Sequence, residues 1–141
     1  MTSQSRLVLV TACALIDDRK RVLIAQRPEG KSLAGLWEFP GGKIEAGESP
    51  EDTLIRELCE ELAIKIDAAN LSAVTFASYR YPDFHLLMPL FVCRKWEGAP
   101  TPLENQAIAW VSMAELRRED SRYPMPPADA PLIPALANFL L

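Results

Sequence analysis

The stretch from residue 41 to residue 64, GGKIEAGESPEDTLIRELCEELAI, decides the fold of this 141-residue chain. It opens with a glycine-rich turn and then carries the signals of a helix. Ser49 is a candidate N-cap, Pro50 is tolerated at the first helical position, and acidic residues follow in the first turn. Apolar residues then recur at helical spacing, at Leu54, Ile55, Leu58 and Leu62. This pattern predicts a helix over about residues 50–62.

Acidic side chains crowd the same part of the chain. Between Glu38 and Leu62 there are eight acidic residues and two basic ones. On a helix with about 100° per residue, Glu57, Glu60 and Glu61 lie beside the apolar stripe and repel one another. A solvated acidic face is one interpretation of such a run. The preceding glycine-rich turn, whose backbone can approach a ligand closely, favours a site for Mg²⁺ and a phosphate-bearing substrate.

Two segments of this stretch resemble the Nudix box. Gly42 begins GKIEAGE, and seven residues after Glu48 the chain continues with RELCEELAI, from Arg56 to Ile64. The family pattern is a glycine, five residues, Glu, seven residues and then Arg-Glu-apolar-x-Glu-Glu-x-Gly-apolar. Every specified position matches except the last glycine, which is Ala63 here. Alanine costs about 1 kcal/mol in the left-handed conformation of a helix end, so we expect a slightly altered helix end and intact chemistry.

The resemblance extends over nearly the whole chain and points to the MutT branch of the superfamily. It is carried by WEFPGGK at residues 37–43, AQRP at 25–28 and PPAD at 126–129. It implies an α/β protein with the Nudix fold, an α/β/α sandwich. A mixed β-sheet would lie between the Nudix helix, about residues 50–62, and a C-terminal helix. We expect residues 1–141 to form one Nudix hydrolase domain.

Apolar runs bounded by turn residues predict the strands. The runs at residues 7–16 and 21–27 flank a four-residue polar turn, which predicts a β-hairpin. A second strand pair is expected at residues 71–81 and 84–94, with an irregularity at Pro89. The remaining expected elements are a short strand at 37–39 stopped by Pro40-Gly41-Gly42, a strand at 107–111, a short helix with Ser112 and Glu115 as its capping box, an extended proline-rich segment at 123–131 and a terminal helix at 132–141.

The resemblance also implies an activity. MutT-like members hydrolyse a nucleoside triphosphate to the monophosphate and pyrophosphate. Carried over by position, Glu60 and Glu61 would ligate Mg²⁺ together with the carbonyl of Gly41, and Mn²⁺ would substitute. Glu57 would ligate the metal or orient and deprotonate the attacking water. Glu104 matches a distal carboxylate that serves as a further ligand or base.

Other matched positions concern the framework and the substrate. Arg56 would pair with Glu48 and hold the acidic constellation rigid. The residues that the resemblance places at the substrate are Arg27, Glu38, Phe39, Phe84 and Asp129. An ionised Asp129 only accepts hydrogen bonds, which suits N–H groups of guanine, 8-oxoguanine or cytosine. The resemblance implies 8-oxo-dGTP as the substrate, and the acceptor-only chemistry of Asp129 leaves CTP or 5-methyl-dCTP as the alternative. ADP-ribose hydrolysis and a non-catalytic nucleotide-binding domain are further alternatives.

Charge and cysteine content bear on the partners. The net charge of −4 disfavours direct binding to nucleic acid, and no run approaches the ~20 apolar residues of a membrane span. Cys13, Cys59 and Cys93 are odd in number and widely spaced, which predicts reduced, buried thiols in a cytoplasmic protein. His85 is expected to be packed or paired. We expect a small-molecule nucleotide as the partner, and a monomer or weak dimer.

Overall fold

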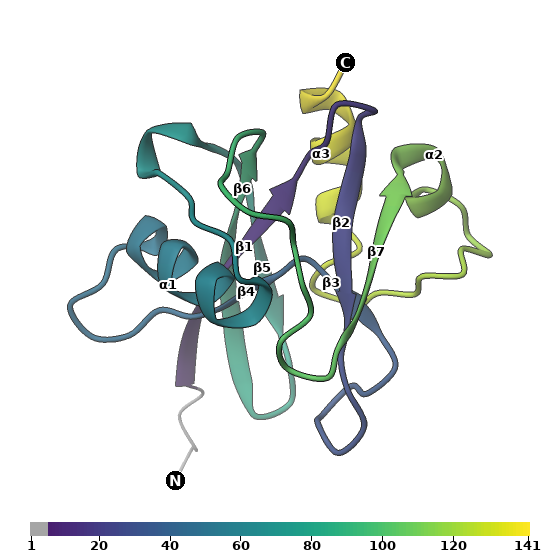
Figure 1. Cartoon of the computed structure of the whole chain (residues 1–141). Coiled ribbons are helices and arrows are strands. Elements are labelled where there is room, and N and C mark those ends of the chain that lie inside the picture. Colours follow the sequence, from purple (N-terminus) through teal and green to yellow (C-terminus); the bar gives the residue numbers. More distant parts are fainter. Residues whose placement is uncertain (1–5) are drawn as a thin grey trace, which may run out of the picture.

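The computed structural model describes residues 6–141, which form seven strands in two sheets (Figure 1). One sheet has the order β4-β1-β6-β5, made of β4 (Gly41–Lys43), β1 (Arg6–Leu15), β6 (Phe84–Cys93) and β5 (Leu71–Arg80). The other has the order β3-β2-β7, made of β3 (Trp37–Glu38), β2 (Arg21–Gln26) and β7 (Ala107–Ser112). Strands β1 and β6 are parallel and the other strand pairs are antiparallel, so the larger sheet is mixed.

Helices cover both sides of the strands, as the expected α/β/α sandwich requires. Helix α1 (Pro50–Leu62) packs on one side and α3 (Leu132–Phe139) on the other (Figure 1). The side chains of β1 contribute alternately to two apolar cores, because successive side chains of a strand point to opposite faces. Cys13 packs in the core of α1, whereas Ala12 packs in the core of α3. The short elements are α2 (Met113–Leu116) and a 3₁₀ turn, η1 (Ala68–Asn70).

Helix α1 begins and ends at the predicted residues. Ser49 Oγ accepts the Asp52 N–H at 3.0 Å, and the Asp52 carboxylate accepts the Ser49 N–H at 3.2 Å, which completes a capping box. The apolar stripe is fully buried at Leu54, Leu58 and Leu62. Ala63 ends the helix in the left-handed conformation, with φ 59° and ψ 34°, and its N–H reaches the carbonyl of Cys59 at 3.1 Å.

The predicted hairpin of residues 7–16 and 21–27 is wrong. After one bridge between Ile16 and Val22, the two strands separate into different sheets. Both edges of β1 are paired, with β4 and β6, and β2 pairs with β3 and β7. The turn at residues 17–20 therefore connects the two sheets instead of closing a hairpin.

Other strand predictions are confirmed or need smaller corrections. Strands β5 and β6 form the second pair, and its irregularity falls between Ala73 and Thr75, near Pro89. Gly41 and Gly42 do not interrupt the sheet structure, because they pair with β1 as part of β4. Residues 127–131 form turns instead of an extended segment, since the Pro126 carbonyl accepts two later N–H groups.

Single residues outside the site also test the sequence analysis. Cys13 and Cys93 are buried as predicted, whereas Cys59 is exposed on α1, so the prediction of a buried thiol is wrong there; all three are free thiols. His85 is paired, with Nε2 at 2.7 Å from the hydroxyl of Ser78. None of the helices formed by residues 6–141 is long and apolar enough to cross a membrane.

Candidate active site

Arg56 on α1 joins carboxylates that the sequence singled out. Its Nε and Nη2 donate to the two oxygens of Glu48 at 2.8 and 2.9 Å, and Nη1 donates to Glu57 Oε1 at 2.9 Å. The hydrogen bonds from Arg56 lower the pKa of Glu48 to about 2. Glu48 is also bound by the hydroxyl of Thr53 at 2.9 Å and the N–H of Glu45 at 3.1 Å. The predicted pairing of Arg56 with Glu48 is present, and it extends to Glu57.

Two glycines of β4 allow the backbone to lie against this cluster. A Cβ at Gly42 would overlap the carboxyl group of Glu57, and a Cβ at Gly41 would overlap the carbonyl of Thr11. The N–H of Gly41 donates to Glu61. A side chain at Gly41 would force the strand away from the backbone of β1, and a side chain at Gly42 would displace the Glu57 carboxylate from its place beside Arg56.

Glu61 is a strongly perturbed acid. Burial raises its pKa to about 8, and the charges of Glu57, Glu104 and Glu38 contribute in the same direction. Its Oε2 is one of two buried side-chain polar atoms without a hydrogen-bond partner among residues 6–141. Burial also raises the pKa of Glu57. The Gln106 amide donates to the Glu61 carbonyl at 3.0 Å, which ties the loop that carries Glu104 to the end of α1.

Glu60 lies at the rim of this acidic cluster. Its side chain is 55% exposed, and its Oε2 is 3.5 Å from Arg56 Nη1. Within the described part of the chain, no three His, Cys, Asp or Glu side chains converge to form a ready metal cage. The charges of Glu60 and Glu104 therefore both act on Glu57, and those of Glu57 and Glu104 act on Glu61, with Glu60 at the exposed edge of the cluster.

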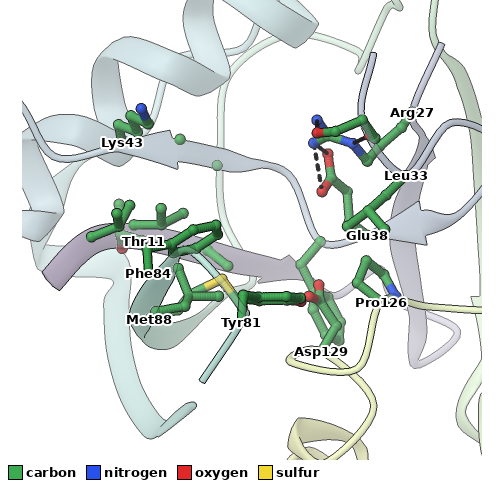
Figure 2. A pocket seen from close by; sticks show the side chains of 18 of the residues that line it. Thr11, Arg27, Leu33, Glu38, Lys43, Tyr81, Phe84, Met88, Pro126 and Asp129 are labelled. Atoms are coloured by element: carbon green, nitrogen blue, oxygen red, sulfur yellow. Dashed lines mark hydrogen bonds and ion pairs between the residues drawn. The ribbon is translucent and has the colours of Figure 1, made fainter. Parts of the chain in front are cut away.

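A largely apolar cavity of about 480 Å³ opens on the other side of β4 (Figure 2). Its apolar wall comes from β1 and β6 and includes Val8, Val10, Phe84, Leu86 and Met88. At its rim, Arg27 Nη1 donates to both oxygens of Glu38 at 3.2 Å, and Arg27 Nε donates to the Ser32 carbonyl at 2.6 Å. Burial raises the pKa of Glu38 despite this ion pair.

Asp129 is the buried charged group of the cavity. It is 6% exposed and accepts the N–H of Phe39, and burial raises its pKa to about 7. Phe39 lines the cavity with a side chain that is only 3% exposed, because it also belongs to the core beneath. Phe84 lines the cavity as well and stacks on Tyr81, with ring centroids 5.1 Å apart.

Sequence reasoning missed several polar residues of this cavity, among them Tyr81 and Lys43. Tyr81 precedes the β5–β6 turn, and its place at the cavity depends on that turn meeting the segment around Asp129. The aromatic residues flanking Pro82-Asp83 were the available signal. Lys43 follows the two glycines, and its position on β4 became clear only when the pairing of β4 with β1 was known.

The acidic cluster and the apolar cavity share one wall. Arg27, Glu38 and Gly41 line the large cavity and also a second cavity of about 290 Å³, which Glu61 and Glu104 line from the other side. A ligand that spans both must combine a flat apolar group with a group that tolerates or binds cations. A nucleotide with several phosphates has both parts.

Comparisons with known proteins agree with this geometry. The NUDIX domain family matches residues 6–136. An 8-oxo-dGTP diphosphatase of Escherichia coli (strain K12) is 35% identical over 123 residues, which cover 87% of this chain and 91% of that protein. A CTP pyrophosphohydrolase of the same strain is 34% identical over 138 residues, which cover 91% and 90%. A structure from an analysis of MutT of Aliivibrio salmonicida and Vibrio cholerae has a TM-score of 0.77 and 30% identity, covering 95% of this chain and 100% of that one.

The family match spans almost all of the described residues, and both E. coli relatives exceed 30% identity over most of their length. The fold, the acidic helix and the adjoining cavity agree with that relationship. The chain therefore belongs to the Nudix family and is a MutT-like Nudix pyrophosphohydrolase.

Proposed function

We propose that this enzyme hydrolyses nucleoside triphosphates to the monophosphate and pyrophosphate with Mg²⁺, and that 8-oxo-dGTP is its preferred substrate. This activity would remove the oxidised nucleotide from the pool. The observation that carries the proposal is the shared wall of the two cavities, from Glu38 to Gly41. A base in the apolar cavity would extend its phosphates along this wall toward Glu57 and Glu61. The relative named 8-oxo-dGTP diphosphatase supports the same choice.

The donor set fits a hard divalent cation. Burial and neighbouring negative charges raise the pKa values of Glu57 and Glu61, and Glu61 Oε2 has no partner within residues 6–141. We assign the cation to Glu57, Glu60 and Glu61, with Glu104 and the Gly41 carbonyl as further ligands. Mg²⁺ usually keeps several waters and binds through one or two carboxylates plus substrate phosphates, so an open cluster suits it. Mn²⁺ prefers the same oxygen ligands. When bound, the ion would stabilise negative charge on the phosphate oxygens and lower the pKa of bound water.

The residues of the chain supply positioning and proton transfer. Arg56 holds Glu57 through Oε1 and ties it to Glu48, so the carboxylate has a defined position. Burial raises the pKa of Glu57, which makes it a better base than an exposed glutamate. We assign to a Glu57 carboxylate oxygen the proton that leaves the attacking water. The negative charge of Glu57 also raises the pKa of Glu61, so the titrations of Glu57 and Glu61 are coupled.

Asp129 supports 8-oxoguanine first and cytosine second. When ionised, the Asp129 carboxylate only accepts hydrogen bonds. It would accept from the N7–H of 8-oxoguanine, whereas the N7 lone pair of guanine would repel it. It also matches the amino group of cytosine. Because one relative is named CTP pyrophosphohydrolase, CTP and 5-methyl-dCTP form the second candidate class. Phe84 would stack on either base, with Arg27 and Glu38 at the rim of the cavity.

The substrate proposal is tested by initial rates with Mg²⁺ on 8-oxo-dGTP, dGTP, CTP, 5-methyl-dCTP and ADP-ribose, with pyrophosphate and phosphate resolved. We expect pyrophosphate release and the highest kcat/KM for 8-oxo-dGTP. A preference for the cytosine nucleotides would keep the reaction and replace the substrate. No turnover by folded protein would overturn the proposed function.

The assignment of the base is tested by Glu57→Gln. We expect kcat to fall by at least about tenfold, because the amide cannot take the proton. Glu51→Gln is the matched control, since Glu51 lies in the first turn of the same helix, away from Arg56. Equal rates for the two variants would remove Glu57 from the reaction.

A further inference from the structure

We propose that Tyr81 is a specificity-determining residue of this enzyme, whose hydroxyl acts with Asp129 to read the edge of the base. The inference rests on the proposed function, because it assigns the apolar cavity to the base. The Tyr81 hydroxyl would donate one hydrogen bond to the base and the Asp129 carboxylate would accept another. The two groups lie side by side at the end of a largely apolar cavity. The ligand class that it fits is a base with a carbonyl oxygen next to an N–H group.

The position of the Tyr81 hydroxyl supports this role. Figure 2 shows its ring pointing across the cavity, with the hydroxyl end toward Asp129. The N–H of Ala128 donates to the Tyr81 oxygen, and Asp129 is the first charged group that acts on it. The ring is fixed on both sides, because it stacks on Phe84 at 5.1 Å and contacts Tyr79 at 4.8 Å between ring centroids. A ring held in this way keeps its hydroxyl at one place in the cavity wall.

The Tyr81 O–H is available to donate a hydrogen bond to a ligand. A phenol has one O–H donor and accepts through its oxygen, and the acceptor side is used by Ala128. Asp129 accepts from Phe39 and has further acceptor capacity when ionised. The pair thus presents a donor next to an acceptor, and this is complementary to a carbonyl beside an N–H. At the N7 edge, 8-oxoguanine has that arrangement in O6 and N7–H, whereas guanine has two adjacent acceptors in O6 and N7. Both bases have the same O6 and N1–H on the opposite side of the carbonyl, so the pair distinguishes them by facing the N7 edge.

Tyr79 is the control residue that distinguishes a hydrogen bond to the base from aromatic packing alone. It lies two residues earlier, on β5, is partly buried like Tyr81, and contacts the Tyr81 ring at an interplanar angle of 57°. It does not line the cavity, however, whereas Tyr81 does. If aromatic packing were the only role of this cluster, removal of either hydroxyl would have the same effect on nucleotide binding.

The experiment compares Tyr81→Phe with Tyr79→Phe. Dissociation constants are measured by calorimetry without divalent cation for 8-oxo-dGMP, dGMP, CMP and deoxyribose 5-phosphate, which has no base. Unfolding curves confirm that both variants fold. We expect wild-type protein to bind 8-oxo-dGMP most tightly. Tyr81→Phe should weaken that binding about tenfold, the loss of one hydrogen bond, with deoxyribose 5-phosphate unchanged. Tyr79→Phe should stay within about twofold of the wild type.

Three results would overturn the role of Tyr81. They are unchanged binding of every nucleotide by Tyr81→Phe, an equal loss on deoxyribose 5-phosphate, and an equal loss in Tyr79→Phe. The hydrolysis rates of wild-type protein on the nucleotide panel show whether the role of Tyr81 or the proposed function itself is wrong. If wild-type protein hydrolyses a nucleotide and Tyr81→Phe keeps its selectivity, only the reading by Tyr81 is wrong. If wild-type protein hydrolyses none, the proposed function fails first.

Discussion

Thr11 on β1 carries a buried hydroxyl without a hydrogen-bond partner within residues 6–141, a property that it shares with Glu61 Oε2. Thr11 is fully buried and pairs in register with Gly42, whose missing side chain makes room for Glu57. The Glu61 oxygen without a partner lies in the acidic cluster to which we assign the cation. The Thr11 hydroxyl is buried in the wall of the large cavity, and a buried group without a partner costs about 1–3 kcal/mol of stability.

We therefore expect Thr11→Val to raise the free energy of unfolding by about 1 kcal/mol, because valine keeps the shape and removes the hydroxyl. Urea unfolding measures the difference. Thr11→Ser is the control, since it keeps the hydroxyl, loses a buried methyl group and should be less stable. A Thr11→Val variant that is less stable than wild type would show that the hydroxyl has a partner, a buried water for example.

Asp129 should make stability depend on pH. Its pKa is about 7 in the fold against an ordinary value of 3.8, with Glu38, Arg27 and Tyr81 as its charged or titratable neighbours. The unfolded chain releases this proton first as the pH rises. The buried carboxyl therefore lowers stability progressively from about pH 4 to pH 7, and the full cost is present above pH 7.

Replacement of this carboxyl by an amide should remove the pH-dependent cost. We expect Asp129→Asn to be more stable than wild type at pH 8 by roughly 2–4 kcal/mol, because the amide oxygen still accepts from Phe39 and no charge is buried. The difference should shrink by more than half at pH 5. Denaturant titrations at both pH values measure it, and a gap that is equal at pH 5 and pH 8 would contradict the buried, titrating Asp129.

At the scale of the element, α1 was predictable because its signals are local. The cap at Ser49, the proline at the first position and the apolar spacing all lie within the helix or next to it, and the helix ends at Leu62 as predicted. The pairing of Arg56 with Glu48 was predictable from the family resemblance alone. The exposure of Cys59 shows the limit, since apolar neighbours in sequence do not decide which helical face a residue occupies.

Ala63 offers a direct test of that helix end. It is exposed and left-handed, with φ 59°, where a Cβ is strained and glycine is not. We expect Ala63→Gly to raise the free energy of unfolding by about 1 kcal/mol and to leave kcat unchanged, because no proposed ligand moves. Thermal unfolding together with one rate measurement checks both parts. Loss of stability would mean that the alanine is better accommodated than its φ indicates.

The wrong hairpin shows why strand partners were harder to predict than strands. The runs at residues 7–16 and 21–27 were recognised as strands from their apolar character, and both exist. Their partners lie far along the chain: Leu9 pairs with Leu87, and Leu23 with Trp110. Both runs have buried residues on both faces, so a period of two gave no information on which edge pairs with which strand. The lining of the large cavity was hard to predict for the same reason, because Tyr81 and Asp129 come together only through long-range packing.

At the scale of the whole molecule, cation and nucleotide should stabilise the fold together. We expect Mg²⁺ with a non-hydrolysable triphosphate analogue, near 100 times its Kd, to raise Tm by roughly 5–10 °C, because ligands that bind only the folded state shift the equilibrium toward it. EDTA should abolish the part of the shift that depends on the cation.

Glu61→Gln is the variant for this comparison. It removes a buried acid with a pKa near 8, so the ligand-free protein should be at least as stable as wild type. The cation-dependent rise in Tm should nevertheless be smaller. An undiminished rise would remove Glu61 from the proposed cation site without affecting the family assignment.

The wall from Glu38 to Gly41 is short, and it faces the large cavity, our proposed base site, on one side and the acids on the other. A base that fits poorly would press on the same backbone that aligns the phosphates, and the reacting phosphate would then be held out of line. Discrimination would then appear as slow turnover of the bound nucleotide in addition to weaker binding. An abundant undamaged nucleotide would then occupy the enzyme as a sluggish substrate and inhibit it competitively, so the cell's own nucleotide levels would set how fast damage is cleared.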